Sequence, residues 1–159
     1  MAYTNLVPVI GTIFRMQRTN DCCSHLMAMQ TGGGIVNFVV SSDTLVMDCR
    51  RLQPGMRVAA FYDSTLPMPL IYPPQYRAAI VAVLKRNEEV MLDFFDRNLI
   101  SASQSLQLNL SGNTQVETLN GQSYGCTPVN QLLLVYYTNT TRSIPPQTTP
   151  RKVVVFCED

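Results

Sequence analysis

The hydrophobic residues of this chain come in short runs that alternate with polar positions, and Gly, Pro, Asn and Ser separate the runs. Leu106, Leu108 and Leu110, for example, alternate with polar residues, which is the period-two pattern of a half-buried strand. Apolar residues rarely keep a helical spacing for long. The pattern predicts an all-β protein with five strands in each half: 7–17, 25–30, 35–40, 57–63 and 77–84, then 90–95, 106–110, 115–119, 131–138 and 151–157.

Turn and bend residues refine this plan. Pro54-Gly55 predicts a turn into the fourth strand, and we expect Leu52, just before it, to close one end of a barrel. Gly11 lies inside the long first strand, where a barrel corner would require a bend or a bulge. Asn120-Gly121 predicts a tight hairpin turn in the second half.

The second half of the chain repeats motifs of the first half in the same order. Both halves contain an aromatic strand end, then a loop, a Pro-Pro-Gln motif and an apolar strand. The aromatic strand ends are Phe61-Tyr62-Asp63 and Tyr136-Tyr137-Thr138, and the motifs are Pro73-Pro74-Gln75 and Pro145-Pro146-Gln147. Asp43-Thr44 and Asn113-Thr114 precede them. This order predicts an internal duplication, with units 1–85 and 86–159. The charged junction at 85–89 is too short for a flexible linker, so we expect the units to pack together.

Three strands, a Leu-x-Pro-Gly turn and two more strands resemble the OB-fold, a five-stranded Greek-key barrel. The chain is therefore expected to hold two tandem OB-like five-stranded β-barrel units. The stretches 61–63, 71–78 and 142–150 are similar to a family of Gram-positive bacterial proteins. In that family this repeated module occurs alone or beside a domain like the N-terminal domain of copper amine oxidases. The family has no established activity, so the resemblance implies a fold and a duplication but no catalytic residue.

Composition predicts a folded chain without a strong preference for polyanions. Hydrophobic residues make up 46% of the sequence and charged residues 14%, which is enough apolar surface for a core. Residues 1–85 carry seven Lys/Arg and four Asp/Glu, a basic excess that is mild for a nucleic-acid binder. No apolar run reaches the length of a membrane span, and the first residues do not look like a secretory signal. We expect a cytoplasmic protein without a membrane partner, and secretion stays open if a leader peptide has been removed.

Enzyme chemistry has little support in the sequence. His25 is the only histidine, and the five cysteines form an odd set without regular spacing, so they are expected to be reduced thiols. Cys23 and His25 would share one face of a strand, but no second ligand pair with zinc-site spacing follows. The glycines at 32–34 predict a hairpin loop and not a phosphate-binding loop, because no helix follows them. We expect no catalytic residue, no metal site and no cofactor.

The Pro-rich loop of the first half is the best candidate for a ligand-binding surface. Together with its flanking strands it holds Tyr62, Asp63, Tyr72 and Tyr76, a stiff aromatic surface at a place where OB-folds commonly bind ligands. The alternative is that this loop and its counterpart fold over the barrel ends or clamp the two units together. The clamp is the simpler interpretation because it needs no ligand.

Arginines suggest a second use of the same region. Arg50, Arg51 and Arg57 supply much of the positive charge of the first half, and beside the tyrosines they would form a groove for stacked bases and phosphates. The function expected first is a non-enzymatic binding or scaffolding module that contacts a protein or an extended ligand through its Pro/Tyr loops. Binding of single-stranded nucleic acid by the first unit is the alternative, and it is less favoured.

Overall fold

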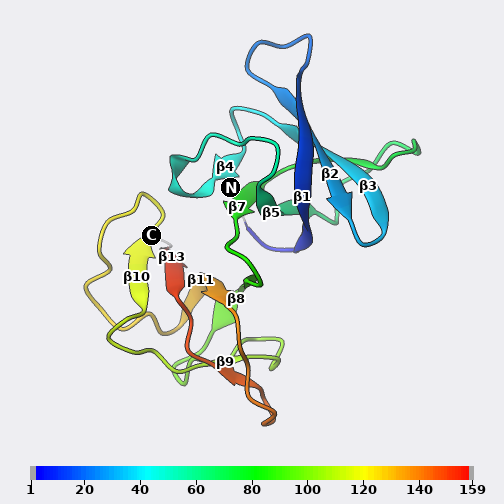
Figure 1. Ribbon diagram of the computed structural model, residues 1–159. Helices are drawn as coiled ribbons and strands as arrows, with labels where there is room; N and C mark the ends of the chain where they lie inside the picture. Colours follow the sequence, from blue (N-terminus) through cyan, green and yellow to red (C-terminus); the bar gives the residue numbers. More distant parts are fainter. Residues whose placement is uncertain (1–2, 158–159) are drawn as a thin grey trace. The chain divides into compact units, whose positions relative to one another are not determined.

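The computed structural model describes residues 3–157 of a chain that divides into two compact units, Met1–Arg86 and Asn87–Asp159 (Figure 1). The regular structure of the described residues consists of β-strands and one short 3-10 turn, η1 (Met47–Cys49). The expected all-β class is therefore confirmed. Within residues 3–157, no helix is long and apolar enough to cross a membrane.

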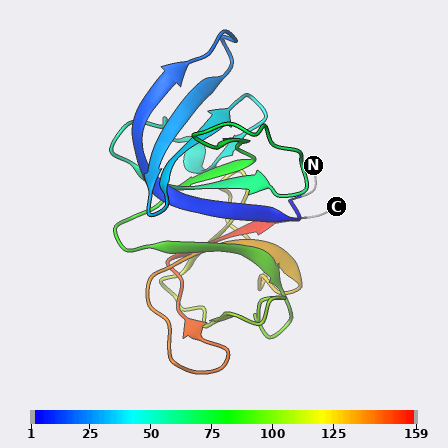
Figure 2. The same ribbon diagram turned by 90° about the vertical axis from the view of Figure 1, so that its right-hand side faces the viewer.

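The first unit is built on one seven-stranded sheet with the order β4-β7-β5-β1-β2-β3-β6. Its long strand β1 pairs antiparallel with β5 through its first half and with β2 through its second half (Figure 2). The strands are β1 (Leu6–Arg18), β2 (His25–Thr31), β3 (Gly34–Val40), β4 (Leu45–Val46), β5 (Arg57–Asp63), β6 (Gln75–Arg77) and β7 (Ile80–Val83).

The strand predicted at 77–84 is divided into β6 and β7 by Ala78 and Ala79. β6 pairs parallel with β3, whereas β7 pairs antiparallel with β5 and parallel with β4, so the two pieces lie toward opposite ends of the sheet order. The amide of Ala78 donates to the carbonyl of Val39 (3.0 Å), and the amide of Ala79 donates to that of Phe61 (2.7 Å). The segment thus passes from one neighbour to the other, and none of the sheets in residues 3–157 is closed into a barrel.

The second unit carries a four-stranded sheet, β10-β13-β11-β8, and a two-stranded sheet, β12-β9. The predicted strand at 106–110 keeps its alternation of buried and exposed positions, but only two of its residues pair with a neighbouring strand. The strands are β8 (Glu89–Phe95), β9 (Gln107–Leu108), β10 (Gln115–Thr118), β11 (Gln131–Tyr137), β12 (Gln147–Thr148) and β13 (Lys152–Phe156). Neither β12 nor the short β4 was predicted, because two-residue strands have no periodicity to detect.

One turn recurs in the two units with matching hydrogen bonds. The hydroxyl of Thr44 donates to the carbonyl of Ala78 (2.7 Å), and the hydroxyl of Thr114 donates to the carbonyl of Pro150 (2.8 Å). Each hydroxyl also accepts a bond from the amide three residues before it, at 3.0 and 3.3 Å. Each turn leads into a short strand, β4 or β10, that runs parallel to the last strand of its unit.

Each unit has its own apolar core. Phe38, Met27 and Val58 are fully buried in the first unit, and the half-buried Leu52 packs against this core. Gly55 has a φ of 95° in the turn after Pro54, a conformation that favours glycine. The core of the second unit is formed by Phe95, Leu106, Leu108, Leu133, Val135, Val153 and Val155.

The bulge expected at Gly11 lies elsewhere. The register between β1 and β2 shifts between Ile13 and Arg15, which places the irregularity at Phe14. Gly11 serves a different need: a Cβ atom there would lie 2.6 Å from the carbonyl oxygen of Gln30, closer than van der Waals contact permits. The glycine therefore allows a close approach of two backbones.

Candidate functional site

Two tyrosines stack where strands β5 and β6 of the first unit meet. The ring centroids of Tyr62 and Tyr76 are 4.0 Å apart, with 20° between the ring planes. Phe38, which is fully buried, lies behind them with its centroid 5.4 Å from that of Tyr76. The aromatic rings thus continue the core of the unit out to its surface. Burial raises the pKa of Tyr76, and the nearby Tyr62 adds to this rise.

A groove opens over this aromatic pair, and we call it the Tyr groove. Its cavity volume is about 290 Å³, which is at the lower end of the range for small-ligand sites. Asp63 and Arg77 line it together with the tyrosines, and the apolar side is provided by the loop residues Leu66, Pro67, Met68 and Pro69. Prolines restrict the backbone of that loop, so the apolar side loses little conformational freedom when it is covered.

A second cavity of about 280 Å³ adjoins the Tyr groove. The two cavities share Asp63, Leu66 and Arg77, and the second extends to Asp43 and Leu6. Together they form a groove that is apolar and aromatic at one end and carries two carboxylates near a guanidinium at the other. A shape of this kind suits an extended chain better than a compact molecule.

The carboxylate of Asp63 also fixes the start of the loop that borders the groove. It accepts hydrogen bonds from the hydroxyl of Thr65 (2.6 Å) and from the Thr65 amide (2.9 Å). These two bonds hold the pKa of Asp63 below its ordinary value. The residue therefore stays ionised near neutral pH and positions the loop at the same time.

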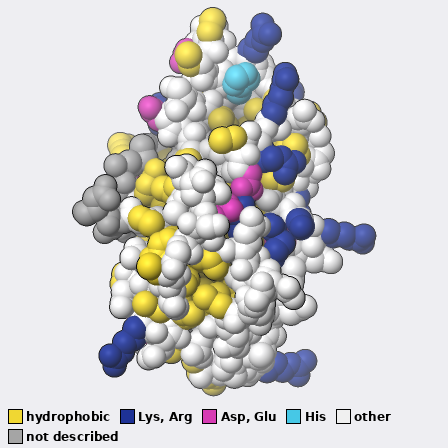
Figure 3. Space-filling view, turned by 90° about the vertical axis from the view of Figure 1, so that its left-hand side faces the viewer, with side chains coloured by type: hydrophobic (Ala, Val, Ile, Leu, Met, Phe, Trp, Pro, Cys, Tyr) yellow, Lys and Arg dark blue, Asp and Glu magenta, His cyan; other side chains and the backbone are white. Residues whose placement is uncertain are grey.

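The predicted arginines do not join the tyrosines. Arg50 and Arg51 line a different cavity of about 400 Å³ with His25, Met16 and Leu52, and this cavity shares no residue with the Tyr groove. Figure 3 shows basic side chains and apolar atoms around the single histidine. Neither arginine forms an ion pair with any residue from 3 to 157. The mixed arginine and tyrosine groove expected from the sequence is thus divided into two sites.

The remaining predicted residues lie outside both cavities. Tyr72 is 87% exposed on the Pro-rich loop and does not line the Tyr groove. Arg57 is the first residue of β5, whereas Tyr62 and Asp63 are its last two residues. The guanidinium of Arg57 donates to the carbonyl of Lys85 (3.4 Å). A side chain with this place at the far end of the strand cannot assist the tyrosines.

The second unit has a cavity at the corresponding strand ends, but its lining is different. This cavity, of about 330 Å³, is lined by Asn109, Thr138, Gln147 and Thr148 at the ends of β9, β11 and β12. Its polar groups are bonded to one another, since the Asn109 amide donates to the Gln147 side-chain oxygen (2.9 Å) and the Thr148 hydroxyl donates to a backbone carbonyl (2.6 Å). At these strand ends, the first unit has an apolar lining and the second unit a polar one.

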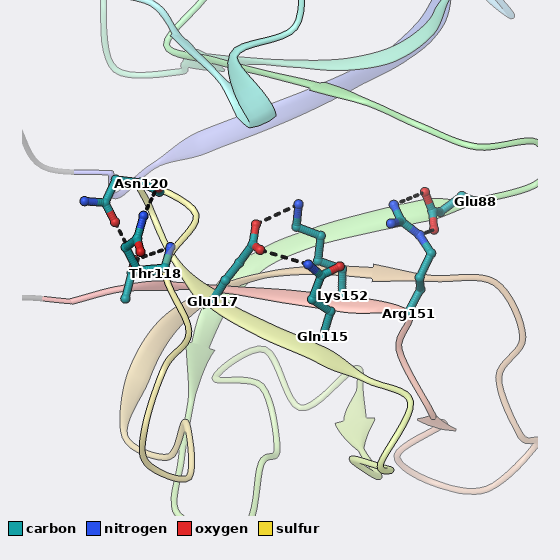
Figure 4. A network of polar contacts seen from close by, with 8 residues as sticks. Glu88, Gln115, Glu117, Thr118, Asn120, Arg151 and Lys152 are labelled. Carbon is teal, nitrogen blue, oxygen red and sulfur yellow. Dashed lines mark hydrogen bonds and ion pairs between the residues drawn. The ribbon is translucent and has the colours of Figure 1, made fainter.

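The second unit also contains two ion pairs (Figure 4). Lys152 lies 2.7 Å from Glu117, and both side chains are nearly buried. Arg151 binds Glu88 through two nitrogens, at 2.7 and 3.0 Å. The cationic ends of Arg151 and Lys152 lie 5.1 and 5.8 Å from the centre of the Tyr136 ring. These charges satisfy one another, which is the arrangement of a structural network.

The Cys23 and His25 pairing considered from the sequence does not form a metal cluster. Asp21 holds the turn instead, because its carboxylate accepts the amide of Cys23 (2.9 Å) and the hydroxyl of Ser24 (3.0 Å), and the pKa of Asp21 is lowered by these bonds. All five cysteines are free and exposed. Within the described part of the chain, no three His, Cys, Asp or Glu side chains gather to hold a metal ion.

Sequence reasoning did not single out Leu66, Arg77 or Asp43 as site residues. Leu66 could have been noticed as an apolar residue next to the prolines. Arg77 was placed in a predicted strand, but the sequence did not indicate toward which side its side chain points.

No protein-family model matches this sequence, and no curated protein matches it.

Proposed function

We propose that this protein is a non-enzymatic binding module whose first unit captures an extended peptide segment of a protein partner in the Tyr groove. The observation that carries this proposal is the continuity of two cavities through Asp63, Leu66 and Arg77. An apolar stretch of peptide would cover the stacked tyrosines and the proline-bordered side, and a basic side chain would reach the carboxylates.

The module itself is proposed to be OB-like and duplicated. The segment from β6 to β7 pairs with β3 at its start and with β5 at its end, as the last strand of an OB-fold does. The matching bonds of Thr44 and Thr114 support two copies of one module. In this view the apolar Tyr groove is a specialisation of the first copy, because the second copy has a polar cavity at the same strand ends.

The peptide proposal is tested by selecting random 12-residue peptides from a phage display library on the immobilised protein. Selected peptides should bind the wild type in fluorescence anisotropy and bind Tyr76→Ala and Leu66→Asp at least about tenfold more weakly, as central interface residues do. Leu66 is 53% exposed, so its substitution should leave the unfolding transition unchanged. Selection of the same peptides on the Leu66→Asp surface would refute the proposal.

Single-stranded nucleic acid is the second candidate ligand, and the cavity with Arg50, Arg51 and His25 supports it. The test is anisotropy of a labelled mixed-sequence oligonucleotide at about 50 and 200 mM salt, because phosphate contacts weaken steeply over that range. Tight binding that is lost with salt and with Arg50→Ala/Arg51→Ala supports this function. The absence of binding at the lower salt concentration removes it.

A further inference from the structure

An isoleucine is displayed on the Pro-rich loop of the second unit. Ile144 is 99% exposed, and Pro145 and Pro146 follow it. Single exposed apolar residues are common on protein surfaces and need no explanation by themselves. This one differs because the loop that presents it is held in place on both sides of it.

Hydrogen bonds within the loop fix its conformation. The Ser143 hydroxyl donates to the carbonyl of Pro145 (2.9 Å), and the Thr141 amide donates to the carbonyl of Gln147 (2.9 Å). The Gln147 amide in turn donates to the Thr141 hydroxyl (3.0 Å). A loop constrained in this way loses little conformational entropy when its exposed side chain becomes buried in a partner. Ile144 therefore has the properties of an anchor residue.

The groove that could receive such an anchor is present on the first unit of the same chain. The Tyr groove offers the apolar side formed by Leu66 and Met68 next to the tyrosine pair. Leu70 and Tyr72, farther along the same loop, are also exposed, at 104% and 87%, but they do not line the groove. Apolar residues that gather around a groove mark an interaction surface more often than scattered ones do.

Charge supports the same pairing. Arg142 lies two residues before Ile144, is exposed, and forms no ion pair with any described residue. The cavity that adjoins the Tyr groove carries Asp43 and Asp63. At the level of the units, residues 1–86 contain eight Lys/Arg and four Asp/Glu, whereas residues 87–159 contain four and seven. The units therefore have net charges of opposite sign, which favours contact between the first unit of one molecule and the second unit of another.

We propose that the loop 142–146 of one molecule inserts into the Tyr groove of a second copy of this chain. Ile144 would then contact the tyrosine pair and the apolar side of the groove, and Arg142 would face Asp43. This inference rests on the proposed function, since it names the peptide segment that the groove receives. Because the loop and the groove are different surfaces, the contact is heterologous, and successive molecules join head to tail.

The test uses two variants that each disable one half of the contact. Ile144→Asp removes the anchor and keeps the groove, whereas Met68→Asp places a charge in the apolar side of the groove and keeps the anchor. Both side chains are exposed, Ile144 at 99% and Met68 at 45%. In sedimentation velocity the wild type should form larger species as its concentration rises from about 10 to 500 µM, the range of weak association. Each variant alone should remain a monomer. An equimolar mixture of the two should form a dimer and nothing larger, because only one functional contact can form.

A control variant and the opposing outcomes complete the experiment. Ile35→Asp changes an exposed side chain that lines none of the described cavities and should associate like the wild type. The inference is overturned if the wild type stays monomeric at the highest concentration, if Ile144→Asp associates normally, or if the mixture does not dimerise. Selected phage peptides that still bind the Tyr groove in those cases would leave the proposed function standing. Failure of peptide binding as well would remove both.

Discussion

The ring of Tyr76 lies on the ring of Tyr62 with the two centroids 4.0 Å apart, and this stack forms the aromatic part of the Tyr groove. Tyr76 comes from a three-residue strand and Tyr62 from the end of β5, so the stack joins two strands that are not neighbours in the sheet. A single side-chain change is therefore expected to affect both the stability of the first unit and the binding surface.

Tyr76→Ala should lower the free energy of unfolding by about 2 to 4 kcal/mol, because it removes a stacked pair and part of the apolar packing of a half-buried ring. Tyr76→Phe keeps the ring and should cost less than about 1 kcal/mol. Urea unfolding followed by circular dichroism measures both values. Equal losses for the two variants would mean that the hydroxyl, and not the stack, provides the stabilisation.

Two half-buried tyrosines, Tyr76 and Tyr137, should make stability depend on pH in the alkaline range. Burial raises the pKa of Tyr76 and of Tyr137 above the ordinary value of 10.0, and for Tyr137 the charge of Glu89 adds to the rise. The folded state thus holds these protons more tightly than the unfolded state does. The stabilisation is fully present below the unfolded pKa and is lost as the pH rises through the folded pKa.

The free energy of unfolding of the wild type should accordingly fall as the pH rises above about 10, and Tyr76→Phe/Tyr137→Phe should weaken this fall. Urea titrations at a series of pH values provide the measurement. Tyr72→Phe is the matched control, because it removes the hydroxyl of a ring that is 87% exposed. If the free energy of unfolding depended on pH in the same way in the wild type and the double variant, the two tyrosines would not be the cause of the alkaline loss of stability.

Much of the fold could be predicted because the long strands have a clear periodicity. The apolar runs of β1, β5 and β11 were found within one residue at either end, since each buries a regular set of side chains. The short strands β4 and β12 were not found, because they depend on hydrogen bonds such as the one from Thr44 to Ala78 rather than on a pattern of apolar residues.

The candidate site was only partly predictable for a related reason. Tyr62, Asp63 and Tyr76 are close together in space because β5 and β6 end near one another, and the aromatic residues could be recognised in the sequence. The location of Arg50 and Arg51 depends on η1, where Asp48 and Cys49 adopt positive φ angles that no sequence signal indicated. Only the fold of this segment brings the two arginines to a separate cavity.

The turn threonines offer a paired test of the two units. Thr44→Val and Thr114→Val keep the shape of the side chain but leave the carbonyls of Ala78 and Pro150 without their side-chain donor. Each should lower the free energy of unfolding by about 1 to 3 kcal/mol. Ser42→Ala, at an exposed position of the same turn, is the control and should change the value by less than about 0.5 kcal/mol. Unequal effects at the two threonines would argue against equivalent roles in the two units.

The ion pair between Lys152 and Glu117 can either stabilise the fold or mainly fix how its strands align, and the free energies of unfolding of single and double variants distinguish the two roles. Removal of one partner, by Lys152→Met or Glu117→Gln, should lower the free energy of unfolding by about 3 to 5 kcal/mol, because a nearly buried charge loses its partner. For Glu117→Gln, the amide can still face the side chain of Gln115, whose nitrogen now lies 3.2 Å from the carboxylate. Its loss should therefore be the smaller of the two.

The double variant Lys152→Met/Glu117→Leu should recover most of that loss, because two apolar side chains leave no unpaired charge in the sheet. A double-mutant cycle in urea, with Lys152→Met, Glu117→Leu and the double variant compared with the wild type at the same pH, measures the coupling between the two side chains. Additive losses would show that each residue acts through other contacts, such as that of Lys152 with the ring of Tyr136. Recovery in the double variant would mean that the pair contributes little net stability and that its charges mainly fix how β10 aligns with β13.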